Sequence, residues 1–270
     1  MTTLQAILLG LLQGVTEFIP VSSSGHLVLV PWVLGWAAPG LAYDTIVHLG
    51  TLGAVVLYLR REILALLKGG WQSLRTFRLE TTEARLFWLL IVSTIPGGLM
   101  GYLWADFFEQ LFGSPRVVSL LLIATGLLLF VSERLGRRSM TLDKMGLSQA
   151  LVMGLAQGCA IAPGLSRSGA TISAGLLCGL KREEAARFSF LMSIPIIAGA
   201  AASQLFKASS AGLGAPQALH LALGFLAALL SGYAAVHFLL SHLRAHSLRP
   251  FSYYCWLAGL AGLALSFVLR

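Results

Sequence analysis

Two polar stretches interrupt an otherwise apolar chain, and they carry the residue types that can do chemistry. In the first stretch, Gln13 and Glu17 are four residues apart, so a helix places both side chains on one face. A carboxylate at membrane depth is costly and is therefore a candidate functional residue. Together with an adjacent amide, it can hold a divalent cation such as Mg²⁺ or Ca²⁺ through oxygen ligands. Gln13 and Glu17 are thus the candidate metal ligands.

Hydroxyl groups and an imidazole follow in the same stretch. Ser22 and Ser23 precede His26 by four and three residues, which places the hydroxyls near the start of a second helical segment and the imidazole one turn later. A serine or a histidine can attack phosphorus as a nucleophile, and a histidine can protonate a leaving phosphate. Ser23 is our candidate nucleophile, with His26 or water as alternatives. Each serine, Ser24 included, also has a simpler role in satisfying backbone groups of the loop.

The second polar stretch contains one cation, Arg167, between Ser166 and Ser168. A guanidinium binds phosphate oxygens with two N–H groups and stabilises the charge that develops during phosphoryl transfer. The free N–H groups at the start of a half-length helix also favour an anion. If the two stretches meet, they combine a carboxylate, an imidazole, a guanidinium and several hydroxyls, and this set of groups suits phosphate chemistry.

The elements that position these groups belong to a membrane protein. The chain has 270 residues, of which 57% are hydrophobic and 11% are charged, and its mean hydropathy is +0.81. Soluble globular chains carry about 25% charged residues, so this composition excludes a cytosolic enzyme, a secreted disulfide scaffold and a disordered regulator. We predict an all-α polytopic membrane protein with a single domain over residues 1–270. Unbroken apolar spans lie at about 45–59, 86–105, 116–132, 188–206, 219–240 and 251–269.

Two further apolar regions, 4–34 and 147–180, are broken by glycine, proline and serine, so each predicts two half-length helices joined by a polar loop. These regions match each other without a gap at an offset of 144 residues. The identical pairs are Gly10/Gly154, Leu11/Leu155, Gln13/Gln157, Gly14/Gly158, Ser22/Ser166, Ser24/Ser168 and Gly25/Gly169. Three unbroken spans follow each copy, so we expect an inverted-topology repeat. Repeat 1 covers about 1–140 and repeat 2 about 145–270, each a re-entrant helix–loop–helix followed by three transmembrane helices.

The Lys and Arg residues indicate an orientation in the membrane. The segments that hold 15 of the 19 are 60–85, 133–145, 181–187 and 241–250. The positive-inside rule places these segments in the cytoplasm, which leaves Arg116, Lys207 and Arg270 on the outer side together with both termini. Because the basic residues lie between the spans and form no single face, the net charge of +8 does not indicate nucleic-acid binding.

Both polar stretches carry a resemblance to a known family. Residues 13–26 (QGVTEFIPVSSSGH) resemble the first motif of the bacterial undecaprenyl-pyrophosphate phosphatases of the bacitracin-resistance type, and residues 163–171 (PGLSRSGAT) resemble their second motif. The resemblance extends over essentially the whole chain. It implies a metal-dependent hydrolase of the bacterial cytoplasmic (inner) membrane that converts undecaprenyl diphosphate into undecaprenyl phosphate and inorganic phosphate. It also implies a site open to the outer face, recycling of the carrier lipid for peptidoglycan and other envelope polymers, and bacitracin resistance.

The resemblance assigns roles to the residues already identified. It implies Glu17 and Gln13 as ligands of the metal or the diphosphate, His26 and a motif serine for covalent attack or proton transfer, and Arg167 for phosphate binding. The other candidate contacts to the diphosphate are Ser22, Ser24, Ser166, Ser168 and Thr171. Many family members have Glu where this chain has Gln13, so a second carboxylate ligand is absent here.

Other interpretations of the same residues are open at this point. A transporter or flippase of the lipid phosphate is an alternative, because inverted repeats with broken helices are also a transporter architecture. A phosphatase of the phosphatidic-acid type is disfavoured, because position 173 is Ser where that family needs His. Asp44 and His48 share a helical face at the start of a span, and we prefer interfacial hydrogen bonding to a contact with the site as their role. The sequence leaves the oligomeric state open, including a homodimer.

Overall fold

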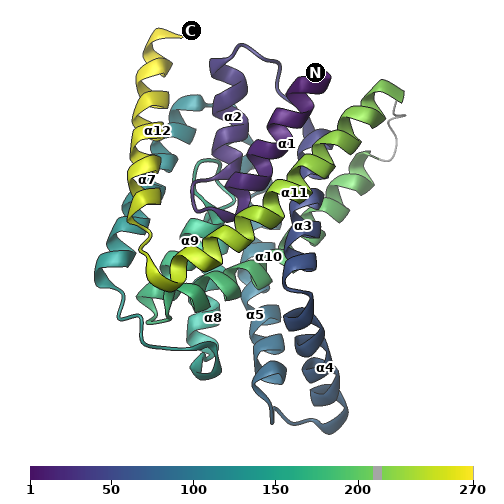
Figure 1. Cartoon of the computed structure of the whole chain (residues 1–270), viewed down its shortest axis with the longest axis vertical. Coiled ribbons are helices and arrows are strands. Elements are labelled where there is room, and N and C mark those ends of the chain that lie inside the picture. The colour runs from purple at the N-terminus through teal and green to yellow at the C-terminus, as the bar shows by residue number, and fades with distance from the viewer. Residues whose placement is uncertain (209–214, 270) are drawn as a thin grey trace.

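The computed structural model describes residues 1–208 and 215–269, and within these residues the chain is helical with no β-strand (Figure 1). Six of the described helices are long and apolar enough to cross a bilayer. They are α3 (Leu41–Tyr58), α5 (Thr82–Leu103), α7 (Pro115–Leu135), α10 (Arg182–Ala208), α11 (Ala215–Ala245) and α12 (Arg249–Val268). Each corresponds to one predicted apolar span, which confirms an all-α polytopic membrane protein.

The two broken regions form pairs of short helices, as predicted. They are α1 (Thr3–Phe18) with α2 (Ser23–Val33), and α8 (Leu147–Cys159) with α9 (Arg167–Leu177). Pro20 lacks the N–H group that would continue α1, and the hydroxyl of Ser22 caps α2 by accepting a hydrogen bond from the N–H of Gly25 at 3.2 Å. Ser166 caps α9 in the same way, accepting from the N–H of Gly169 at 3.0 Å. Serines at equivalent positions of the repeat therefore start both second half-helices.

The two hairpins enter the bundle from opposite ends. The α1–α2 hairpin opens toward the end where the N-terminus lies (Figure 1). At the opposite end, the backbone of Met140, which precedes α8, pairs with Gly179, which follows α9. The tips of the hairpins meet inside the molecule, because a Cβ on Gly25 would lie 3.2 Å from the Cα of Gly164. This crossing brings the N-terminal ends of α2 and α9 together.

Close helix contacts hold each hairpin in place. Helix α1 packs along α11, and helix α8 packs along α5. A Cβ on Gly10 would collide with the carbonyl oxygen of Gly224 on α11, and a Cβ on its equivalent, Gly154, would collide with that of Ser93 on α5. Small residues allow this close approach of helix backbones. Glycines of the repeated motif thus have the same packing role in both halves of the chain.

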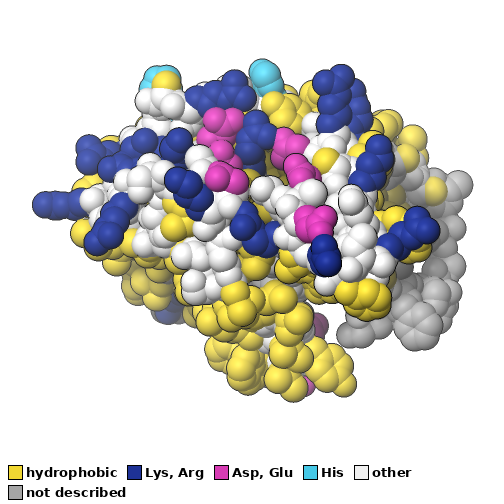
Figure 2. Space-filling view, turned by 90° about the horizontal axis from the view of Figure 1, so that it is seen from below, with side chains coloured by type: hydrophobic (Ala, Val, Ile, Leu, Met, Phe, Trp, Pro, Cys, Tyr) yellow, Lys and Arg dark blue, Asp and Glu magenta, His cyan; other side chains and the backbone are white. Residues whose placement is uncertain are grey.

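Basic side chains gather at the end of the molecule opposite the N-terminus, with acidic side chains among them (Figure 2). Glu133, buried at the end of α7, accepts a hydrogen bond from Arg138 at 2.5 Å and also pairs with Arg182 of α10. Arg187 of α10 pairs with Glu62. These ion pairs connect several helices at the charged end of the bundle.

Two helices lie outside the predicted elements: α4 (Arg60–Thr76) and α6 (Ala105–Phe112). The first lies in segment 60–85, which the sequence analysis treats only as a charged connection. It continues the chain from α3 after a break at Leu59 and packs against α5. A short 3₁₀ turn, η1 (Leu142–Lys144), precedes α8. The side chain of Lys207 and all of Arg270, which the charge count assigns to the outer side, lie outside the described residues.

Candidate active site

Glu17 is the centre of the polar cluster formed where the two hairpins cross. Its Oε2 accepts hydrogen bonds from Nε2 of Gln13 at 2.9 Å and from Oγ of Ser23 at 2.5 Å. Its Oε1 accepts from Nη2 of Arg167 at 2.8 Å, and the residue is only 6% exposed. The structure therefore brings together four of the predicted site residues, from α1, α2 and α9.

Arg167 reaches Glu17 from the first turn of α9. Its side chain is 15% exposed, and the ion pair with Glu17 is largely shielded from solvent. The second terminal nitrogen, Nη1, is buried and has no hydrogen-bond partner among the described residues. An unpaired buried N–H group of a cation is energetically costly. This nitrogen is therefore available to an anion such as a phosphate group.

Within the described part of the chain, Gln13 has an unpaired acceptor oxygen, in contrast to the unpaired donor of Arg167. Its Nε2 is engaged by Glu17, whereas its Oε1 is buried and has no partner among the described residues. Oxygen acceptors of this kind suit Mg²⁺ or Ca²⁺, and Mg²⁺ in particular keeps several waters or substrate phosphate oxygens as its other ligands. The described residues contain no group of three or more His, Cys, Asp or Glu that could hold a metal ion. Gln13 and Glu17 thus fit a cation held jointly by protein and substrate, and they do not form a closed protein cage.

The motif serines divide into two kinds. Ser22 and Ser166 cap α2 and α9, and their hydroxyls lie 3.3 Å and 3.2 Å from those of Ser24 and Ser168. These four serines line the crossing of the two loops, but described contacts account for much of their hydrogen-bonding capacity. Ser23 is different, because its hydroxyl donates to a carboxylate.

Thr171 is the predicted diphosphate contact with the least geometric support. It is buried, and its hydroxyl donates to the carbonyl of Arg167 at 2.8 Å and lies 2.6 Å from the hydroxyl of Ser189 on α10. These contacts connect α9 to α10. Binding of the diphosphate by Thr171 stays a prediction.

His26 lies one turn into α2 and shares no hydrogen bond with Glu17. Its Nδ1 is 2.7 Å from the carbonyl oxygen of Ser22, and its Nε2 is 2.7 Å from the hydroxyl of Tyr254 on α12. His26 is 6% exposed. The sequence analysis did not identify Tyr254, which lies in an ordinary apolar span with no polar motif around it.

His48 lies next to Glu17, a contact that the sequence analysis ranked below interfacial hydrogen bonding. Its Nε2 lies 3.7 Å from Oε2 of Glu17. Its Nδ1 is 2.7 Å from the carbonyl oxygen of Asp44 and must donate to it, because a carbonyl only accepts. The helical spacing of Asp44 and His48 predicts that they share one face of a helix. It does not predict which neighbouring helix that face contacts.

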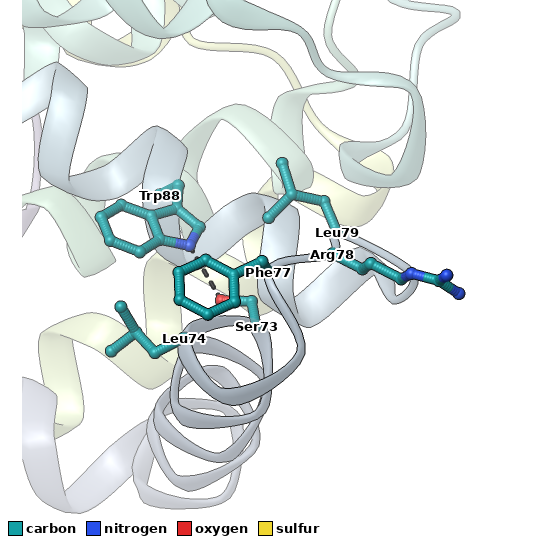
Figure 3. Close-up of a pocket in the computed structure, with 6 residues that line it drawn as sticks. All are labelled: Ser73, Leu74, Phe77, Arg78, Leu79 and Trp88. Carbon is teal, nitrogen blue, oxygen red and sulfur yellow. Dashed lines mark hydrogen bonds between the residues drawn. The ribbon is translucent and has the colours of Figure 1, made fainter.

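A surface hollow of about 390 Å³ lies elsewhere, where α4 ends and α5 begins (Figure 3). Its lining is Ser73, Leu74, Phe77, Arg78, Leu79 and Trp88. The indole of Trp88 donates to the hydroxyl of Ser73 at 2.9 Å, while Arg78 points away and pairs with Glu80 at 3.2 Å. Since it is lined by mostly apolar side chains without a carboxylate, this hollow is not a candidate for phosphate chemistry.

Comparison with known proteins assigns the chain to a family. Residues 6–261 match the family model described as bacitracin resistance protein BacA. A protein named undecaprenyl-diphosphatase from Rubrobacter xylanophilus is 52% identical over 254 residues, which are 93% of each chain. Proteins with the same name from Moorella thermoacetica and Pelobacter propionicus are 47% identical over 254 residues (94% of each chain) and 43% identical over 270 residues (100% of this chain, 98% of the relative). The chain therefore belongs to the bacitracin resistance protein BacA family.

Proposed function

We propose that this membrane protein hydrolyses undecaprenyl diphosphate to undecaprenyl phosphate and inorganic phosphate. The observation that carries the proposal is the buried cluster in which Glu17 contacts Ser23 and Arg167 at the crossing of the two hairpins. A nucleophile, a proton acceptor and a phosphate-binding cation are the groups that phosphoryl transfer needs. The names of the relatives supply the substrate, and the transporter alternative gains no support from them.

Arg167 binds the diphosphate in this proposal. In the absence of substrate its Nη2 is paired with Glu17, and its Nη1 is unpaired. An incoming diphosphate engages Nη1 first and then shares the guanidinium fork, which matches phosphate oxygens in a bidentate manner. As the terminal phosphoryl group transfers, the same cation stabilises the charge on its oxygens. The N-terminal ends of α2 and α9 add backbone N–H groups at this point.

Ser23 is the proposed nucleophile. Its Oγ forms a bond to the terminal phosphorus while the bond from that phosphorus to the bridging oxygen breaks, and undecaprenyl phosphate leaves with that oxygen. The hydroxyl proton passes to Glu17, whose Oε2 already accepts it in a hydrogen bond of 2.5 Å. Water then attacks the phosphoserine, which releases inorganic phosphate and restores the hydroxyl. His26 supports the loop rather than attacking phosphorus, because both of its ring nitrogens are engaged.

A divalent cation, Mg²⁺ or Ca²⁺, is part of the proposal. Gln13 Oε1 and Glu17 would hold it next to the diphosphate. When bound, it neutralises part of the charge of the diphosphate. Position 13 is an amide and not a carboxylate, so Gln13 adds no negative charge to that of Glu17 at this ion.

We further propose that the two halves are an inverted repeat, with the site open to the outer face of the bacterial inner membrane and both termini outside. Two observations support this orientation. The two hairpins enter the bundle from opposite ends, and many of the Lys and Arg residues lie in segments 60–85 and 133–145, which the positive-inside rule places in the cytoplasm. The side chain of His48, which lies beside Glu17, is 32% exposed, so the cluster is not closed on the side of this histidine. The product supplies carrier lipid for peptidoglycan and other envelope polymers, and its resupply gives bacitracin resistance.

The experiment that tests the function is phosphate release by the purified protein in detergent. The substrates are undecaprenyl diphosphate and farnesyl diphosphate, each with Mg²⁺, with Ca²⁺ and with a chelator. We expect release from the undecaprenyl lipid that the chelator abolishes and either cation restores. Protein with Glu17→Gln provides the inactive control. A parent protein that releases no more phosphate than a reaction without protein would refute the proposed function.

A further inference from the structure

The hydrogen bonds of His26 define the protonation of its ring. The carbonyl oxygen of Ser22 only accepts, so Nδ1 of His26 carries a hydrogen and donates it at 2.7 Å. In the neutral ring, Nε2 then has the lone pair, and the hydroxyl of Tyr254 donates to it at 2.7 Å. The three groups therefore form one directed chain of hydrogen bonds, from Tyr254 through His26 to the backbone of Ser22.

The chain of hydrogen bonds ends on an unusual piece of backbone. Ser22 has a φ of 70°, in the left-handed region that a residue with a side chain rarely adopts. Its carbonyl belongs to the peptide bond that leads into Ser23, and Ser23 donates to Glu17. A group that holds this carbonyl also holds the peptide from which Ser23 begins. The carbonyl accepts from the backbone N–H of His26 at 3.2 Å as well as from its ring.

Tyr254 comes from a distant part of the sequence and from the last helix. Its ring stacks on that of His26 with a centroid distance of 5.6 Å and an interplanar angle of 10°. Tyr254 is 45% exposed, whereas His26 is 6% exposed, so the tyrosine covers the imidazole. Next to it, Cys255 contacts the carbonyl oxygen of Pro20 at 3.7 Å. Helix α12 therefore contacts α2 and the loop between α1 and α2 through two successive residues.

We propose that Tyr254 is a positioning residue of the reaction. Its hydroxyl holds His26 in the tautomer that has hydrogen on Nδ1, and His26 in turn holds the strained Ser22 peptide that directs Ser23 toward Glu17. Tyr254 acts through His26 and needs no contact with the substrate. The effect on catalysis rests on the proposed phosphatase function, whereas the effect on the imidazole does not.

The first test is steady-state phosphate release by Tyr254→Phe in detergent. Loss of one hydrogen bond to the imidazole should lower kcat about 10-fold and change KM less than about twofold, because the phosphate-binding groups are untouched. Tyr253→Phe is the matched control, since Tyr253 is similarly exposed (49% against 45% for Tyr254) and packs on Trp256 on the same helix. It should keep the parent kcat. A parent kcat in Tyr254→Phe, or an equal loss in both variants, would overturn the proposal.

A double-mutant cycle tests whether Tyr254 acts through His26. In the His26→Ala background, Tyr254→Phe should cause no further loss of kcat. Losses that multiply in the double variant would mean that Tyr254 acts independently, which contradicts the proposal.

A second measurement does not depend on turnover. The ring ¹⁵N resonances of His26, assigned by difference from His26→Ala, should show a hydrogen-bonded Nε2 in the parent and in Tyr253→Phe. In Tyr254→Phe, the Nε2 resonance should move to the position of a nitrogen without a donor. An unchanged resonance would refute the proposed hydrogen bond, even if the protein turned out to act on another substrate.

Discussion

Replacement of Arg167 separates the binding of phosphate from the stabilisation of a buried carboxylate. The guanidinium uses Nη2 for Glu17 at 2.8 Å and has Nη1 free for the substrate. Arg167→Lys keeps a single charged nitrogen that can pair with Glu17 but removes the second prong. Loss of a main stabiliser of transition-state charge lowers kcat by about 10²–10³-fold, or about 2.7–4 kcal/mol. We expect this loss in Arg167→Lys with little change in the thermal midpoint.

Arg167→Ala should lose more activity and also stability. It leaves the carboxylate of Glu17 buried without its cation, and breaking one side of a buried pair costs about 3–5 kcal/mol of unfolding free energy. Adding Glu17→Gln should restore much of the stability, because it removes the uncompensated charge, but none of the activity.

The assay combines phosphate release from undecaprenyl diphosphate with melting curves in detergent for each variant. Arg116→Lys is the control, because Arg116 donates to the carbonyl of Ser266 at 2.9 Å, away from the cluster around Glu17. It should keep the parent rate. If Arg167→Lys hydrolyses the lipid at the parent rate, the two-pronged contact with phosphate is not used, and the site formed by the crossing loops loses its main support.

Three further predictions address other parts of the site and the topology. Glu17→Gln should lower kcat by about 100-fold or more, since it removes the proton acceptor of Ser23 and a metal ligand; near-normal turnover would exclude the carboxylate from the mechanism. Gln13→Glu should remain active, with an altered preference between Mg²⁺ and Ca²⁺. A phosphoenzyme trapped by rapid acid quench should be absent in Ser23→Ala, and trapped phosphate on His26 would contradict the assignment of Ser23. Ser22→Ala should still form the phosphoenzyme, but its free energy of unfolding should fall by about 1 kcal/mol because the cap of α2 is lost. Cysteine labelling in intact cells should find residues 60–85 and 133–145 inside and both termini outside, and a cytoplasmic C-terminus would refute the inverted repeat.

Features that depend on local sequence were predictable for this chain. The six long helices follow from unbroken apolar runs, because a span needs only length and composition. The two hairpins follow from Pro20, Ser22 and their equivalents in the second half, since these residues end and cap helices whatever the rest of the fold does. The gap-free repeat and the cost of charge at membrane depth also pointed to Glu17 and Arg167 as partners in one site.

The tertiary structure decided which side chains from other helices complete the site. His48 faces Glu17 and Tyr254 faces His26 only because α3 and α12 have a particular rotation and depth beside the hairpins. A helical sequence defines which residues share a face, but the partner of that face depends on how every helix packs against its neighbours. Helix α4 packs against α5 and contains no unbroken apolar run of spanning length, so the search for spans did not find it. Local sequence therefore determined the six long helices and the two hairpins and pointed to Glu17 and Arg167 as candidate partners. Helix packing determined that these two residues meet and that His48 and Tyr254 lie beside them.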